Sequence, residues 1–216
     1  MEKITLLEEE FGDIISKIER FTALSSWKFK QNIEGGEKVS VDDSGWEERS
    51  HPYWSLRDGP AYLRKWVEIP PEIEGISLDG STVNLEFLFP SGVELFVDGR
   101  KVYNHRFWAD RVATPFPLLK DARSGERHLL VFRTPTGDEI GSFWIANLQI
   151  DRVEEVLFEL RCILQQIKFA INIANWERRN ELKKSIKMAV DILNIEDLKQ
   201  RNWRNVLSQI KEAEKA

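Results

Sequence analysis

The feature that most restricts the fold is a double change in the period of the apolar residues. In residues 1–23, apolar side chains recur every three or four positions, which predicts an amphipathic helix with a narrow apolar stripe. The residues of this stripe are Ile4, Leu7, Phe11, Ile14, Ile18 and Phe21. From residue 27 to 150 the pattern is that of short β-strands, and from 151 to 216 it is helical again. The sequence therefore predicts three parts: an N-terminal helix (1–23), a β-domain (27–150) and a C-terminal helical segment (151–216).

The β-domain is predicted from short runs rich in aromatic and β-branched residues, which alternate with turn clusters such as EGGE, DDSG, RDGP, PSG and PTGDE. The runs are WKFKQNI, YLRKWVEI, TVNLEFLF, VELFVDG, RKVYN, HLLVFRT and SFWIANLQI. Asp98-Gly99, in VELFVDGRKVYNH, predicts a hairpin with a type I′ turn, because both turn residues of that type need a positive φ. Regular strands without helices between them predict an antiparallel sandwich or barrel.

The C-terminal segment predicts about three helices. The first has a wide apolar face from Val153 to Ala174, the second runs over Leu182 to Leu193, and the third over Leu198 to Ile210. We expect these helices to pack on each other and on the N-terminal helix, although the stripe of that helix is also able to pair with a second chain. The predicted class is α+β: an antiparallel β-sandwich with an N-terminal helix and a C-terminal bundle of about three helices.

Charge and composition exclude several functions. The chain has 216 residues and net charge −5; residues 151–216 carry 13 Lys and Arg against 11 Asp and Glu, net +2, so residues 1–150 carry −7. Nucleic-acid binding favours clustered basic residues, so nucleic acid is not an expected partner. The charged N-terminal sequence does not resemble a signal peptide, and no apolar run is long enough to span a membrane. The single cysteine, Cys162, suits a reducing compartment, and we expect a cytoplasmic protein.

Catalytic motifs are not visible. His51, His105 and His128 are far apart in the sequence and form no H-x-H, H-x-D or H-E-x-x-H pattern. Neither a G-x-S-x-G nucleophile turn nor a glycine-rich phosphate loop occurs. A pair of carboxylates that meet only in the folded chain is the one open possibility, because such a pair has no local signature. We therefore expect no catalytic residues, no metal ligands and no cofactor in this chain.

Aromatic residues in loop-like or strand-edge positions are the most distinctive remaining feature. A sugar ring stacks its C–H face on an aromatic ring while its hydroxyl groups take hydrogen bonds from polar neighbours. The candidate carbohydrate-binding residues are Trp46, Tyr53, Trp54, His105, Trp108, Asp110 and Arg111. The alternative is that these tryptophans fill the core and ends of a small β-domain, which is the commoner role of tryptophan.

The ordered series WKFK, VDDSGWEERSHPYW, YLRKWVEIP, VELFVDGRKVYNH and GERHLLVFRTPTG resembles the non-catalytic N-terminal β-sandwich of glycoside hydrolases, a jelly roll of the galactose-binding type. The layout of helix, sandwich and a helical segment such as DRVEEVLFELRCILQQIKFAINIA is most similar to the N-terminal region of family 38 α-mannosidases. The resemblance extends over nearly the whole chain. The individual motifs are short, so the likeness lies in their order.

The resemblance implies a role beside a catalytic domain. In those α-mannosidases the catalytic domain supplies a His-x-Asp zinc pair and a carboxylate nucleophile, and neither motif can be placed on this sequence. Zinc is accordingly expected only in a separate catalytic domain or subunit, the implied partner. Two roles stay open. The sandwich binds a mannose-type saccharide, or it is an assembly element that packs against a catalytic partner or a second copy of itself. A stand-alone carbohydrate-binding module and an oligomerisation protein without a sugar ligand are the alternatives.

Overall fold

The computed structural model describes residues 2–50, 53–54, 60–89, 92–105, 115–134, 142–143, 145–176 and 180–215. It divides into two compact units. The sandwich unit comprises residues 22–71 and 79–149, and the helical unit comprises residues 1–21, 72–78 and 150–216. None of the helices among the described residues combines the length and the hydrophobicity that a membrane crossing requires.

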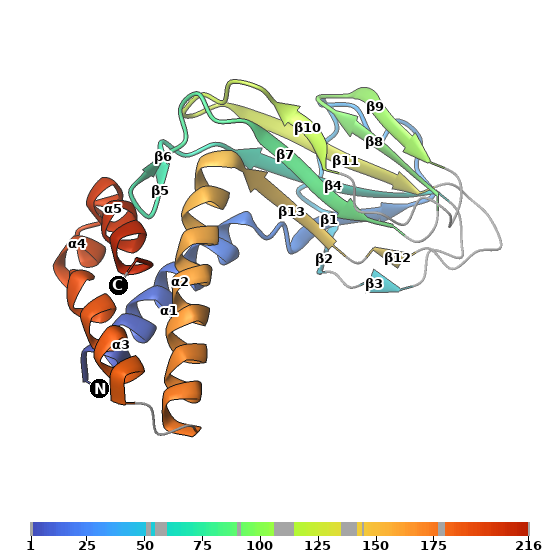
Figure 1. Cartoon of the computed structure of the whole chain (residues 1–216). Helices are drawn as coiled ribbons and strands as arrows, with labels where there is room; N and C mark the ends of the chain where they lie inside the picture. The colour runs from blue at the N-terminus through green and yellow to red at the C-terminus, as the bar shows by residue number, and fades with distance from the viewer. Residues whose placement is uncertain are drawn as a thin grey trace. The chain divides into compact units, whose positions relative to one another are not determined.

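The sandwich unit is built from antiparallel strands in two main sheets (Figure 1). The larger sheet has the strand order β2-β1-β4-β11-β8-β9, with β1 Ser26–Gln31, β2 Glu47–Ser50, β4 Ala61–Glu68, β8 Val93–Val97, β9 Arg100–His105 and β11 Arg127–Thr134. The smaller sheet has the order β10-β7-β13, with β7 Val83–Leu88, β10 Phe116–Leu119 and β13 Ile145–Ile150. A short ladder joins β3 (Tyr53–Trp54) to β12 (Ser142–Phe143).

Aromatic side chains fill the core between the two sheets. The ring of Phe132 on β11 lies 5.1 Å from Trp27, 5.0 Å from Phe87 and 4.7 Å from Phe89, centroid to centroid. The indole nitrogen of Trp27 donates a hydrogen bond to the carbonyl oxygen of Leu24, at 2.5 Å, so this buried polar group is satisfied. The alternating burial of β7 shows the strand pattern of period two that the sequence predicts.

The hairpin between β8 and β9 has the predicted turn. Asp98 and Gly99 both adopt a positive φ, 51° and 79°. Asp98 is also held from the neighbouring strand, because its Oδ1 accepts the backbone N–H of Leu129 at 2.8 Å and its own N–H donates to the carbonyl of Leu129 at 2.9 Å. The aspartate thus fixes the hairpin to the middle of the sheet, and the predicted fold class, α+β with an antiparallel sandwich, is confirmed.

The helical unit contains α1 and the helices that follow the sandwich. Its elements are α1 Glu2–Thr22, β5 Glu72–Ile73, β6 Ile76–Ser77, α2 Asp151–Trp176, α3 Asn180–Ile192, α4 Ile195–Lys199 and α5 Trp203–Ala213. The central residues of the predicted α1 stripe, Leu7, Phe11, Ile14 and Ile18, are fully buried. Ion pairs connect α1 to α2, through Glu19 with Arg161 and through Glu8 with Lys168. In this unit α1 therefore docks on the C-terminal helices of its own chain.

The predicted third helix is wrong in one respect, because it is interrupted at Arg201. This residue has a φ of 56°, which ends α4 and redirects the chain into α5. Its guanidinium donates to Glu74 Oε2 and Glu10 Oε1, both at 2.8 Å, and to the carbonyl of Leu198 at 2.7 Å. Trp203 Nε1 donates to the carbonyl of Glu74 at 2.8 Å. The β5–β6 hairpin, which the sequence pattern did not indicate, is held in the helical unit by these two side chains.

Candidate functional site

A buried arginine organises one face of the larger sheet. Arg64 on β4 is only 1% exposed, and its charge is met by four acceptors. Nε donates to Asp43 Oδ2 at 2.8 Å, and the remaining nitrogens donate to the carbonyl oxygens of Gly36, Lys38 and Val41 at 2.6, 3.0 and 3.2 Å. A guanidinium is stable in such a place only when its donors are satisfied. Arg64 therefore binds the irregular segment of residues 33–46 onto the sheet.

Trp46 ends this segment and lies beneath it rather than on an open surface. The side chain is 7% exposed and packs in a cluster with Tyr62, Phe96, Leu129 and Val131. The guanidinium carbon of Arg64 lies 5.4 Å from the centre of the Trp46 ring, a cation–π distance. A stacking platform for sugar needs an exposed ring face. The structure therefore corrects the candidate set at this position, because Trp46 is a core residue.

A polar cleft of about 220 Å³ lies beside Arg64. Its lining residues come from β1, β2, β4 and the 33–46 segment, and they are Ser26, Lys28, Asp43, Glu48, Arg64, Lys65 and Trp66. Strand register explains the grouping, since Lys28 is the cross-strand neighbour of both Glu48 and Arg64. We call this cleft, with its seven lining residues, the polar cleft.

The charges of the polar cleft satisfy one another. Lys28 Nζ lies 2.9 Å from Glu48 Oε1, and this hydrogen bond lowers the pKa of the exposed Glu48 carboxyl. Lys65 Nζ donates to the carbonyl of Ser26 at 2.8 Å, and burial lowers the pKa of its ammonium. A lowered pKa keeps the Glu48 carboxyl ionised at neutral pH. The cleft thus offers a fixed set of cationic and anionic groups to a ligand.

The indole in the polar cleft is Trp66, which is half-buried and packs against the cluster around Trp46. The guanidinium carbon of Arg127 lies 4.4 Å from the centre of its ring. Because Arg127 covers the ring, polar groups rather than an open aromatic face define the cleft. Sequence reasoning did not single out Trp66, Lys28 or Glu48. A usable signal was the charged Arg64 directly after the apolar residues Ala61, Tyr62 and Leu63.

The other predicted site residues are only partly described. Tyr53 and Trp54 form β3 and pair with Phe143 and Ser142, while their side chains lie outside the described part of the chain. Trp108, Asp110 and Arg111 also lie outside the described residues. The carbohydrate site built from these residues stays a prediction.

His105 ends β9 at the edge of the larger sheet. Its Nε2 lies 3.2 Å from the carbonyl oxygen of Phe89, so a tautomer protonated at Nε2 donates a hydrogen bond there. The ring packs edge-on against Tyr103 at a centroid distance of 5.8 Å. Register places His105 opposite Val93 in the last pair of the β8–β9 ladder. The described contacts give His105 a structural role in closing this end of the sheet.

Within the described ranges, no three His, Cys, Asp or Glu residues are arranged to hold a metal ion. His128 has instead an acidic environment, with Nδ1 2.8 Å from Asp98 Oδ2 and Nε2 3.0 Å from Glu126 Oε1. Burial alone lowers the pKa of His128, but the interactions with the two carboxylates outweigh it and raise this pKa.

No protein-family model matches the chain, and no curated protein matches it. Solved structures resemble part of it. A glycosyl hydrolase family 2 member from Bacteroides cellulosilyticus DSM 14838 matches with 23% identity and a TM-score of 0.48, over 58% of this chain and 20% of that chain. A β-glycosidase from Bacteroides vulgatus matches with 15% identity and a TM-score of 0.48, over 61% of this chain and 20% of that chain. A Bacteroides uniformis β-glucuronidase matches with 17% identity and a TM-score of 0.46, over 59% of this chain and 17% of that chain. The chain thus spans a fifth or less of the length of these enzymes, and the likeness concerns the fold.

Proposed function

We propose that the chain is a non-catalytic module of a cytoplasmic glycoside hydrolase and that its main role is assembly with the catalytic domain or subunit. The order of the sandwich motifs, from WKFK to GERHLLVFRTPTG, supports this context. Those motifs favour a family 38 α-mannosidase, whose zinc then belongs to the partner. A solved enzyme with a similar fold is a family 2 member, so the binding test includes a partner of each kind.

The observation that carries the assembly role is an exposed aromatic pair on α2. Phe158 is 65% exposed and Phe169 is 68% exposed. The two residues are eleven positions apart, and at 3.6 residues per turn this is about three full turns, so both lie on one face of the helix. Large apolar side chains that remain in water on one face mark a protein-binding surface. We assign this face to the catalytic partner.

The test measures binding between purified proteins. The chain is titrated against the catalytic domain of an α-mannosidase of family 38 and, separately, that of a β-glycosidase of family 2, both from the same organism. We expect one of them to bind, and the variant Phe158→Ser/Phe169→Ser to weaken binding at least tenfold, because interface aromatics carry much of the binding energy. Met188→Ser on α3, another exposed apolar position, is the matched control. Equal binding by the α2 variant contradicts the assignment, as does binding to neither domain.

A second function, carbohydrate binding, is favoured by the polar cleft. Its volume of about 220 Å³ is below the roughly 300–1,000 Å³ of pockets for drug-sized ligands, so it suits one sugar residue. A sugar hydroxyl can donate to the Glu48 carboxylate and accept from the Lys28 ammonium. A mannose-type oligosaccharide should then shift NMR signals around the cleft at millimolar concentration. Lys28→Ala should abolish the shifts, whereas Lys120→Ala, at an exposed position outside the cleft, should keep them. Unchanged spectra on adding saccharide exclude this second function.

A further inference from the structure

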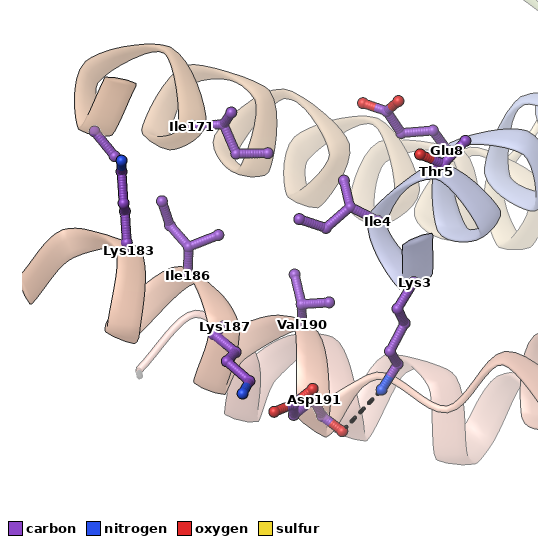
Figure 2. A pocket seen from close by; sticks show the side chains of 11 residues that line it. Lys3, Ile4, Thr5, Glu8, Ile171, Lys183, Ile186, Lys187, Val190 and Asp191 are labelled. Carbon is purple, nitrogen blue, oxygen red and sulfur yellow. Dashed lines mark hydrogen bonds between the residues drawn. The ribbon is translucent and has the colours of Figure 1, made fainter. Parts of the chain in front are cut away.

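An apolar groove with a basic rim lies within the helical unit (Figure 2). It has a volume of about 580 Å³ and is bounded by the first turns of α1, the last turns of α2 and one face of α3. Its apolar lining consists of Ile4, Ile171, Ala174, Ile186 and Val190. Figure 2 shows Ile4, Ile171, Ile186 and Val190 pointing toward the same open space. This site is distinct from the polar cleft and from the exposed face of α2.

The sequence of α3 explains why the lining is apolar on one side and basic on the other. Lys183 and Lys187 are one helical turn apart, and so are Ile186 and Val190. The two rows lie next to each other along the helix, so the lysines stand at the rim of the surface that the apolar residues form. An amphipathic ligand can use both rows at once.

The positive charges at the rim exceed the negative ones that face them. Among the described residues, no carboxylate forms an ion pair with Lys183 or Lys187. Lys3 Nζ donates to the backbone carbonyl of Asp191 at 3.1 Å. The acids that line the groove are Glu8, which is 3.8 Å from Lys168 Nζ, and Asp191. Two ammonium groups are therefore available to an anionic headgroup beside an apolar surface.

We propose that this groove binds a single-chain fatty acid, with the carboxylate at Lys183 and Lys187 and the alkyl chain against Ile4, Ile171 and Ile186. The volume lies within the range of small-molecule pockets. A flexible alkyl chain can follow this apolar surface, and the two ammonium groups at its rim complement a carboxylate. The inference goes beyond the proposed function and does not depend on it.

The experiment uses the whole chain and dodecanoate below its micellar concentration. Calorimetry should give saturable binding of one molecule, and the methyl NMR signals of Ile4, Ile171 and Ile186 should shift. Each methylene that leaves water strengthens binding by at most about fourfold, so affinity should rise from octanoate to decanoate to dodecanoate. Dodecyl trimethylammonium, with the same chain and a positive head, should bind at least tenfold more weakly, because it meets the lysines with like charge.

The charge contribution is isolated by two variants with the same change in net charge. Lys183→Glu/Lys187→Glu should weaken dodecanoate binding at least tenfold, while Lys184→Glu/Lys211→Glu, at exposed positions outside the groove, should leave it within twofold. Equal melting temperatures of the two variants show that the fold is kept. The proposal is overturned if dodecanoate does not bind saturably, if the cationic amphiphile binds equally well, or if both variants lose affinity alike.

Discussion

Each unit of the molecule has an arginine that gathers segments distant in the sequence, but the two arginines do so in different surroundings. Arg64 in the sandwich unit is 1% exposed and meets one carboxylate and three backbone carbonyls. Arg201 in the helical unit is 17% exposed and lies among the carboxylates of Glu10, Glu74 and Asp13. In the first network a buried guanidinium bonds mainly to backbone dipoles, and in the second a partly hydrated guanidinium bonds to carboxylates.

The comparison teaches that the number of contacts does not decide what an arginine contributes. Removing a buried charge leaves its partners without their hydrogen bonds in a place to which water has little access. Removing a partly hydrated charge lets water replace it, and salt screens what remains. The two sites should therefore respond differently to the same substitution and to the same buffer.

The largest effect is expected for Arg64→Met. The variant keeps most of the side-chain volume but leaves Asp43 and three carbonyl oxygens unpaired, so the free energy of unfolding should fall by about 3–5 kcal/mol. Denaturant unfolding followed by tryptophan fluorescence measures this. Arg127→Met, at an exposed position of the same sheet, should cost less than about 1 kcal/mol. A loss below about 1 kcal/mol for Arg64→Met would show that the 33–46 segment does not need the arginine.

A smaller effect is expected for Arg201→Met. It removes the hydrogen bonds to Glu10 and Glu74, and we expect a loss of about 1–3 kcal/mol. The measurement is again denaturant unfolding, with Arg204→Met on the exposed face of α5 as the control. A loss as large as that of Arg64→Met would abolish the distinction between the two networks.

Salt should separate the two networks further. Raising ionic strength from about 0.05 to 1 M shortens the screening length to about 3 Å, which weakens the charge cluster around Arg201. The difference in unfolding free energy between the wild type and Arg201→Met should shrink, while the difference for Arg64→Met should stay nearly constant because that site is buried. Thermal or chemical unfolding at several salt concentrations tests both. If salt reduced both differences in unfolding free energy equally, the contrast between a buried Arg64 and a partly hydrated Arg201 would be contradicted.

The smallest effect is expected from His128, which joins the hairpin turn at Asp98 to Glu126. Because the folded state raises the pKa of His128, its protonated form stabilises the fold below about pH 6.5. This contribution is lost as the pH rises through the raised pKa. After screening by water it amounts to about 0.5 kcal/mol. The wild type should therefore lose stability relative to His128→Gln as the pH rises above about 6.5. A stability difference that does not change with pH would argue against the pairing of His128 with these carboxylates.

Local patterns explain why much of the fold was predictable. The period of apolar residues predicts the position of the strands and of α1, and Asp98-Gly99 predicts its turn, because these depend on neighbouring residues. The break at Arg201 was missed because its left-handed conformation is maintained by Glu10 and Glu74, more than a hundred residues away in the sequence. The β5–β6 hairpin was missed for the same reason, because contacts with Arg201 and Trp203, far away in the sequence, hold it in the helical unit.

The candidate site was harder to predict than the fold. An aromatic residue in a loop-like stretch has the same local sequence whether it faces water or the core, and Trp46 faces the core because Arg64 closes the segment over it. The polar cleft depends on register, which brings Lys28 beside Glu48 and Arg64. The basic rim of the groove was visible in the spacing of Lys183 and Lys187, but its apolar wall needs three helices from both ends of the chain.

The excursion of residues 72–78 into the helical unit has a consequence for synthesis on the ribosome. The chain passes between the two units four times, and the helical unit takes residues from the beginning, the middle and the end of the sequence. The sandwich unit has all of its residues once position 149 has emerged, whereas α1 and the β5–β6 hairpin must wait for the segment after 150. The apolar stripe of α1 is thus made before the sandwich unit and covered only after it. Slowed translation between the synthesis of α1 and that of the segment after residue 150 prolongs the exposure of Phe11 and Ile14 to chaperones and proteases.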